Sequence, residues 1–83
     1  MLAYILLNCI PSQEKNIIED LNKISEVVEC NVIMGKYDII VKITGNLPGD
    51  MDLAVSKIRS IKGVTSSYTM TAVYGQGGSI DKK

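Results

Sequence analysis

The chain has 83 residues, 46% of them hydrophobic, and its nine Lys and Arg residues balance nine Asp and Glu residues to a net charge of zero. A chain of this length forms one small domain, and its neutral charge excludes the basic field on which nonspecific binding to nucleic acid or to an anionic membrane depends. It contains no histidine, the commonest general base and metal ligand, so we expect no catalytic residue, no metal and no cofactor.

The beginning of the chain predicts a strand, a helix and a second strand. Residues 2–9 are rich in Ile, Leu and Tyr and predict a strand. This apolar run is too short for a signal peptide or a membrane span, so we expect a cytoplasmic protein. Ser12 is the expected N-cap of the helix, and the β-branched residues 27–34 predict the second strand. The helix has an apolar stripe at helical spacing, made of Ile17, Ile18, Leu21 and Ile24.

The remainder of the chain predicts the same elements in a second copy. After a turn at residues 35–37, residues 38–44 predict a third strand. The segment GNLPGD at residues 45–50 predicts a turn, with Asp50 as the expected N-cap and Gly63 as the expected C-cap of a second helix. Residues 64–74 predict the last strand. We expect the domain to span residues 1–75 and residues 76–83 to form a disordered tail.

An internal repeat fixes the expected fold class. The second helix has a stripe with the spacing of the first, made of Ala54, Val55, Ile58 and Ile61. Strand–helix–strand repeated twice with right-handed crossovers predicts an α+β, ferredoxin-like βαββαβ sandwich, with a four-stranded antiparallel sheet that carries two helices on one face. The first strand is apolar on both sides, with Tyr4 and Leu6 on one and Ile5 and Leu7 on the other. We therefore expect a second copy of the chain to cover the face without helices.

Two cysteines, Cys9 and Cys30, are separated by a spacing that matches no metal or redox motif. We interpret them as small buried hydrophobic residues in a reducing compartment. A disulfide or a shared metal is the alternative that this spacing leaves open.

Two polar clusters interrupt the predicted strands. The first is residues 35–38, Gly-Lys-Tyr-Asp, and the second is the hydroxyl row of Thr65, Ser67 and Thr69. The first could be a hairpin turn in which glycine supplies a positive φ, and the second could be ordinary strand-forming residues. The alternative is a receptor for a zwitterion, in which Asp38 binds an ammonium group while the backbone near Gly35 and the hydroxyls of Ser67 and Thr69 bind a carboxylate.

The segments that contain these clusters also resemble a known family. Residues 33–43 read IMGKYDIIVKI and residues 59–75 read RSIKGVTSSYTMTAVYG. They resemble the Gly-x-Tyr-Asp signature and the Gly-Val ending of the effector-binding (RAM) domain of Lrp/AsnC transcription regulators, and the likeness extends from Ala3 to about Val73. Because the chain starts directly on the first strand, it resembles the members that stand alone without a DNA-binding part.

The resemblance implies a domain that dimerises through its sheets and assembles into rings, commonly tetramers of dimers. It also implies that an amino acid binds between dimers, in contact with Gly35, Tyr37, Asp38, Ser67 and Thr69. Two residues depart from the family pattern: Ser67 stands where threonine is more common, and Met34 stands where a small hydroxyl residue is common. Both departures bear on which effector would fit.

The leading hypothesis is a non-enzymatic oligomeric sensor of an amino-acid-like effector, which acts through assembly with a full-length Lrp/AsnC regulator and does not contact nucleic acid itself. One alternative is a small cofactor-free ferredoxin-like enzyme of the monooxygenase or isomerase type. The other is a purely structural oligomer whose turn binds nothing.

Overall fold

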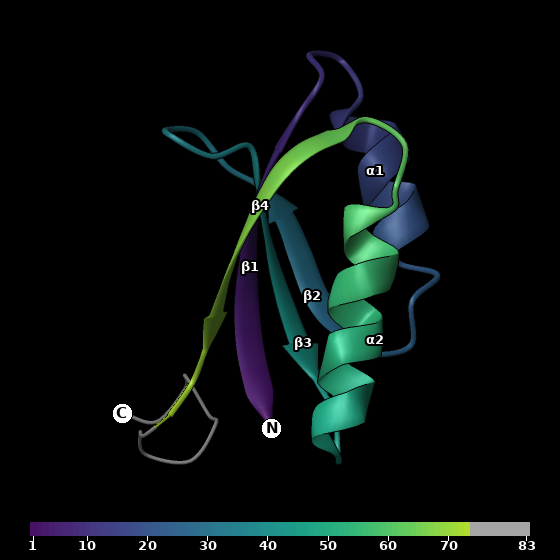
Figure 1. The fold of residues 1–83 in the computed structure, drawn as a ribbon. Helices are drawn as coiled ribbons and strands as arrows, with labels where there is room; N and C mark the ends of the chain where they lie inside the picture. The colour runs from purple at the N-terminus through teal and green to yellow at the C-terminus, as the bar shows by residue number, and fades with distance from the viewer. Residues whose placement is uncertain (74–83) are drawn as a thin grey trace.

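The computed structural model describes residues 1–73 as a four-stranded antiparallel sheet with two helices packed on one face (Figure 1). The strand order across the sheet is β2-β3-β1-β4. This is the predicted ferredoxin-like βαββαβ fold. The elements in chain order are β1 (Leu2–Cys9), α1 (Glu14–Leu21), β2 (Val27–Val32), β3 (Ile39–Thr44), α2 (Pro48–Arg59) and β4 (Val64–Thr71). The last strand ends at Thr71, so the predicted end at Tyr74 was too late, and the predicted tail, residues 76–83, lies outside the described residues.

Strand β1 lies in the interior of the sheet between β3 and β4, and its side chains alternate between two environments. Ala3, Ile5 and Leu7 are buried against the helices, whereas Tyr4 and Leu6 are half-buried on the opposite face. The helix-facing side of the sheet and the inner stripes of the helices form one core, whose members are Ala3, Ile5, Leu7, Cys9, Ile17, Leu21, Ile39, Val41, Ile43, Met51, Ala54 and Ile58.

The start of α1 differs from the prediction. Ser12 is not the N-cap, because it has a φ of 69° and its hydroxyl donates to the Pro11 carbonyl. The helix begins at Glu14, with Gln13 at the N-cap position. The Gln13 carbonyl accepts the first helical bond from the N–H of Ile17, at 3.0 Å. Pro11 and Ser12 form a turn, so Ser12 is not available as the N-cap. The helix therefore starts one residue later than it would with Ser12 as its cap.

The start of α2 also differs from the prediction. Asp50 lies at the third helical position, since the helix begins at Pro48. Proline suits the first helical position because the N–H that it lacks would have no partner there. The Asp50 carboxylate still stabilises this end of the helix: its Oδ2 accepts from the N–H of Leu47 at 3.1 Å and from the N–H of Asn46 at 3.2 Å.

Gly63 was expected to cap the end of α2, and this expectation was wrong. The helix ends at Arg59, and its C-cap is Ser60 in a right-handed conformation. Gly63 follows three residues later with a φ of 101°, a conformation that favours glycine. Its carbonyl accepts from the N–H of Ile10 at 2.9 Å, so Gly63 joins the end of β1 to the start of β4. A Cβ at this position would lie 3.3 Å from Ile17 Cδ1.

Neither helix within residues 1–73 is both long and apolar enough to cross a membrane.

Candidate functional site

The turn at residues 35–38 is the hairpin that joins β2 to β3. The N–H of Ile33 donates to the carbonyl of Asp38 at 2.9 Å and closes the loop. Strand β2 ends at Val32 and not at Met34 as expected. Gly35 has a φ of 135°, and a Cβ built there would meet nothing within 4 Å. Glycine is therefore required by the backbone conformation and not by crowding. In Figure 1 this loop projects from the sheet on the side away from the helices.

Asp38 anchors this turn to β1 through both its backbone and its side chain. Its N–H donates to the carbonyl of Leu7 at 2.8 Å. Its Oδ2 accepts from the N–H of Cys9 at 2.9 Å. The pairing of β1 with β4 shifts register between Asn8 and Cys9. At this irregularity the Asp38 side chain provides the hydrogen-bond acceptor for the N–H of Cys9. An ionised carboxylate offers about four acceptor sites, and Asp38 thus has capacity for further donors.

The hydroxyl row of β4 reaches the same end of the sheet from the other side of β1. Leu7 pairs with Ile39 of β3 on one side and with Ser67 of β4 on the other. The backbones of Ile39 and Ser67 are therefore two strand spacings apart, about 10 Å. Thr69 pairs with Ile5, two residues further along the strand, about 7 Å from Ser67.

The structure therefore brings four of the five predicted site residues to one end of the sheet. Gly35, Tyr37 and Asp38 belong to one hairpin, Ser67 lies across β1 from it, and Thr69 lies further along β4. Ser67 is half-buried and Thr69 is exposed. Since both pair with residues of β1 that point to the helices, the two hydroxyls belong to the helix-facing side of the sheet at its outer edge.

Both cysteine thiols are free in the structure. Burial raises the pKa of the Cys9 thiol, and the neighbouring carboxylates of Asp38 and Glu14 raise it further. Burial also raises the pKa of the Cys30 thiol, with Glu29 adding to the effect. Low thiol pKa values mark reactive cysteines, and both shifts run in the opposite direction. Among residues 1–73, no group of three or more His, Cys, Asp or Glu side chains is placed to hold a metal ion.

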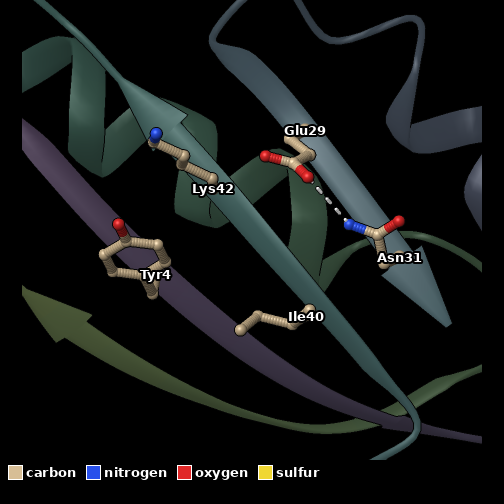
Figure 2. Close-up of a pocket in the computed structure, with 5 residues that line it drawn as sticks. All are labelled: Tyr4, Glu29, Asn31, Ile40 and Lys42. Carbon is tan, nitrogen blue, oxygen red and sulfur yellow. Dashed lines mark hydrogen bonds between the residues drawn. The ribbon is translucent and has the colours of Figure 1, made fainter. Parts of the chain in front are cut away.

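The sequence reasoning missed a hollow of about 220 Å³ on the face of the sheet opposite the helices (Figure 2). The residues that line it come from three neighbouring strands and are Tyr4, Glu29, Asn31, Ile40 and Lys42. Within it, the Asn31 amide donates to Glu29 Oε2 at 3.1 Å. Glu29 and Lys42 are paired in the register of β2 and β3. Alternation along each strand predicts which residues share this face, but the strand order that groups them is visible only in the structure.

Comparison with known proteins places the chain in a family. A model described as the Lrp/AsnC ligand binding domain matches residues 2–74. The chain belongs to the Lrp/AsnC family. The HTH-type transcriptional regulator FL11 of Pyrococcus horikoshii is 33% identical over 70 residues, which cover 84% of this chain and 46% of the relative. The chain spans about half the length of the curated relatives it matches, 49% and 46%.

Solved structures of the Lrp/AsnC type share the fold. The crystal structure of FFRP-DM1 has a TM-score of 0.82 at 33% identity, and the match covers 87% of this chain and 97% of that one. A transcriptional regulator from Neisseria meningitidis, crystallised as a complex with L-Met, has a TM-score of 0.78 at 16% identity. That match covers 88% of this chain and 49% of that one, and at this identity it shows the fold alone.

Proposed function

We propose that residues 1–75 form a non-enzymatic, oligomeric sensor domain, which binds a small amino-acid-like effector and modulates transcription by assembling with a partner regulator in the cytoplasm. The observation that carries this proposal is the anchored hairpin of residues 35–38. Asp38 bonds this hairpin to β1, at the same end of the sheet as Ser67. The residues of a binding site must be held in place by their surroundings, and the bonds of Asp38 hold this turn in place.

The chemistry of the site suits a zwitterion. Asp38 supplies a carboxylate for an ammonium group, and an ionic hydrogen bond of this kind is about twice as strong as a neutral one. The backbone at Gly35 and the hydroxyls of Ser67 and Thr69 supply donors for a carboxylate. Since the two hydroxyls lie on the outer edge strand, a second copy of the chain placed against that edge would enclose the ligand. An amino acid as effector class is also consistent with the L-Met complex of the distantly related Neisseria regulator.

The relatives support action through a partner. They are named HTH-type transcriptional regulators and are about twice as long as the matched region. In residues 1–73 the two helices are separated by β2 and β3, so they do not form a helix-turn-helix. We therefore propose that these residues influence transcription by co-assembly with a full-length Lrp/AsnC regulator, within homo-oligomers built from dimers and closed as a tetramer of dimers.

One observation favours a second candidate function, that of a purely structural turn. The Asp38 carboxylate already has a partner in the N–H of Cys9, and this bond alone would account for an aspartate at this position. In that case the hairpin would stabilise the domain and bind nothing.

A thermal-shift panel of the twenty amino acids, at a fixed protein concentration, separates the two candidates. A ligand at ten times its Kd adds about 1.4 kcal/mol to the folded state. For a domain of this size we expect the Tm to rise by roughly 6–11 °C. Selective stabilisation by one chemical class supports the sensor, and the absence of any shift at millimolar concentration supports the structural turn.

Two matched variants localise the response to the site. Thr69→Val removes one proposed ligand donor while keeping the shape of the side chain. Thr71→Val makes the same change two residues further along β4, on the same side of the sheet and outside the proposed site. We expect the first variant to reduce the ligand-induced shift and the second to leave it unchanged. An equal loss in both variants would contradict the assignment of Thr69.

A further inference from the structure

The hollow on the sheet face opposite the helices has a polar rim that the proposed effector site does not use. Three residues of this rim are neighbours across β1, β3 and β2, because Tyr4 pairs with Lys42 and Lys42 pairs with Glu29. Ile40 follows on the same face of β3, two residues from Lys42, and pairs with Asn31. The hollow therefore combines a cation, an anion and a phenol with an apolar side chain.

Two hydrogen-bond donors of the rim have no partner within the hollow. Among the five residues drawn in Figure 2, the one hydrogen bond joins the Asn31 amide to Glu29 Oε2. Lys42 has no carboxylate within 4.0 Å in the described part of the chain. In Figure 2 the Lys42 side chain lies between Tyr4 and Glu29, and its ammonium group points to the Tyr4 side. The Tyr4 hydroxyl and the Lys42 ammonium group are thus neighbouring donors that one carboxylate can satisfy together.

The other side of the rim offers an acceptor. Glu29 accepts one hydrogen bond from Asn31, at 3.1 Å, and an ionised carboxylate has about four acceptor sites. A hydroxyl or ammonium group of a ligand is the matching donor. Ile40 and the ring of Tyr4, both half-buried, supply apolar surface. Since a molecule of liquid water occupies about 30 Å³, a hollow of about 220 Å³ has room for roughly seven non-hydrogen atoms.

The proposed oligomer, on which this inference rests, gives these groups a need for partners. A second copy that covers this face removes water from Lys42 and Glu29. A charge that loses its water without gaining a partner is strongly unfavourable. A ligand with one anionic group and one donor supplies both partners, and the second copy completes the site by closing it from solvent.

We propose that the hollow binds a small carboxylate that has a hydroxyl or ammonium group on the neighbouring carbon, which is a 2-hydroxy or 2-amino acid. Its carboxylate accepts from the Lys42 ammonium group and the Tyr4 hydroxyl, and its hydroxyl or ammonium group donates to Glu29. Its short carbon chain lies on Ile40. This site is on the opposite side of the sheet from the hydroxyls of the proposed effector site.

An amide NMR titration of the full chain with three matched probes tests the ligand class. The probes are L-lactate, L-alanine and L-lactamide, which has the shape of L-lactate with a neutral amide in place of the carboxylate. We expect L-lactate or L-alanine to shift the amides of Tyr4, Ile40 and Lys42, and the acid that does so identifies the donor as hydroxyl or ammonium. No shift of these amides with either acid at millimolar concentration, or an equal shift with L-lactamide, would overturn the proposal.

Matched lysine variants test the carboxylate contact. Lys42→Met removes the charge from a side chain of similar length and should weaken binding at least about tenfold, as loss of one partner of a buried charge pair does. Lys62→Met makes the same change at an exposed lysine outside the hollow and should leave binding unchanged. Equal affinities of these two variants would contradict the assignment of Lys42.

Tyr4→Phe keeps the ring and removes the hydroxyl, so it tests the same contact if Lys42→Met fails to fold. It should weaken binding of the acid while leaving the melting temperature of the free chain nearly unchanged. Full affinity in Tyr4→Phe would remove the hydroxyl from the proposed site. The amides of Gly35 and Asp38 are read in the same spectra, so failure of the hollow leaves the sensor proposal standing.

Discussion

Replacing Asp38 by alanine and by asparagine separates its structural role from its proposed ligand contact. Alanine removes the acceptor for the N–H of Cys9, which lies 2.9 Å from Oδ2 in a residue that is 8% exposed. A buried donor left without a partner costs about 1–3 kcal/mol. For a domain of this size, each kcal/mol lowers the Tm by roughly 4–8 °C, so Asp38→Ala should melt roughly 4–24 °C below the parent.

Asparagine keeps an oxygen acceptor at the same position and removes the charge. The bond to Cys9 becomes a neutral hydrogen bond, and the expected loss of stability is below about 1.5 kcal/mol. Both variants should lose the ammonium contact, and with it the thermal shift caused by the effector. The assay is a thermal melt of parent, Asp38→Asn and Asp38→Ala at equal protein concentration, with and without the effector.

The control for this pair is Asp52→Ala, which removes an exposed carboxylate of α2 and should change neither quantity. The reasoning would be refuted if asparagine and alanine destabilised the domain equally. It would also be refuted if Asp38→Asn kept the full response to the effector, since the carboxylate charge would then contribute nothing to binding.

Three further predictions follow from the fold. Gly35→Ala should cost about 1–3 kcal/mol in chemical unfolding, because only the backbone strain of its positive φ opposes the change, whereas Gly49→Ala within α2 should not destabilise. Ile5→Ala should cost about 2–5 kcal/mol, because Ile5 is fully buried, and Leu53→Ala at the exposed face of α2 serves as its control. The raised pKa of the Cys9 thiol means that the unfolded chain gives up the proton first, so the free energy of unfolding should fall as pH rises above the ordinary thiol pKa of 9.0, and Cys9→Ala should reduce this slope. A flat alkaline profile in the parent would contradict the last of these.

The sequence allowed the element order and the faces of the strands to be predicted, because burial imposes a two-residue period on β1 and a helical period on α1 and α2. It did not allow the helix ends to be placed correctly. Ser12 and Asp50 are residue types that suit an N-cap, yet the backbone turn at Pro11–Ser12 and the proline at position 48 moved both helix starts by one or more residues. Capping depends on local backbone angles, which residue type constrains only weakly.

Only part of the geometry of the candidate site could be predicted from the sequence. The pattern around Gly35 predicted a hairpin, and the structure confirms it. The bond from Cys9 to Asp38 could not be predicted, because it depends on an irregular register near Asn8 that no local pattern encodes. Alternation placed Ser67 and Thr69 on one side of β4, but which side faces the helices follows only from their pairing with Leu7 and Ile5.

The measurement that tests the central proposal most directly is a two-dimensional amide NMR titration of the chain with the amino acids that raise its Tm. The sensor account predicts that the backbone amides of Gly35, Asp38, Ser67 and Thr69 shift in proportion to occupancy, while the amide of Thr71 does not. Shifts confined to Glu29, Asn31 and Lys42 would place the ligand in the hollow of the opposite face. Such a result, or the absence of any shift, would contradict the proposal that the 35–38 hairpin binds the effector.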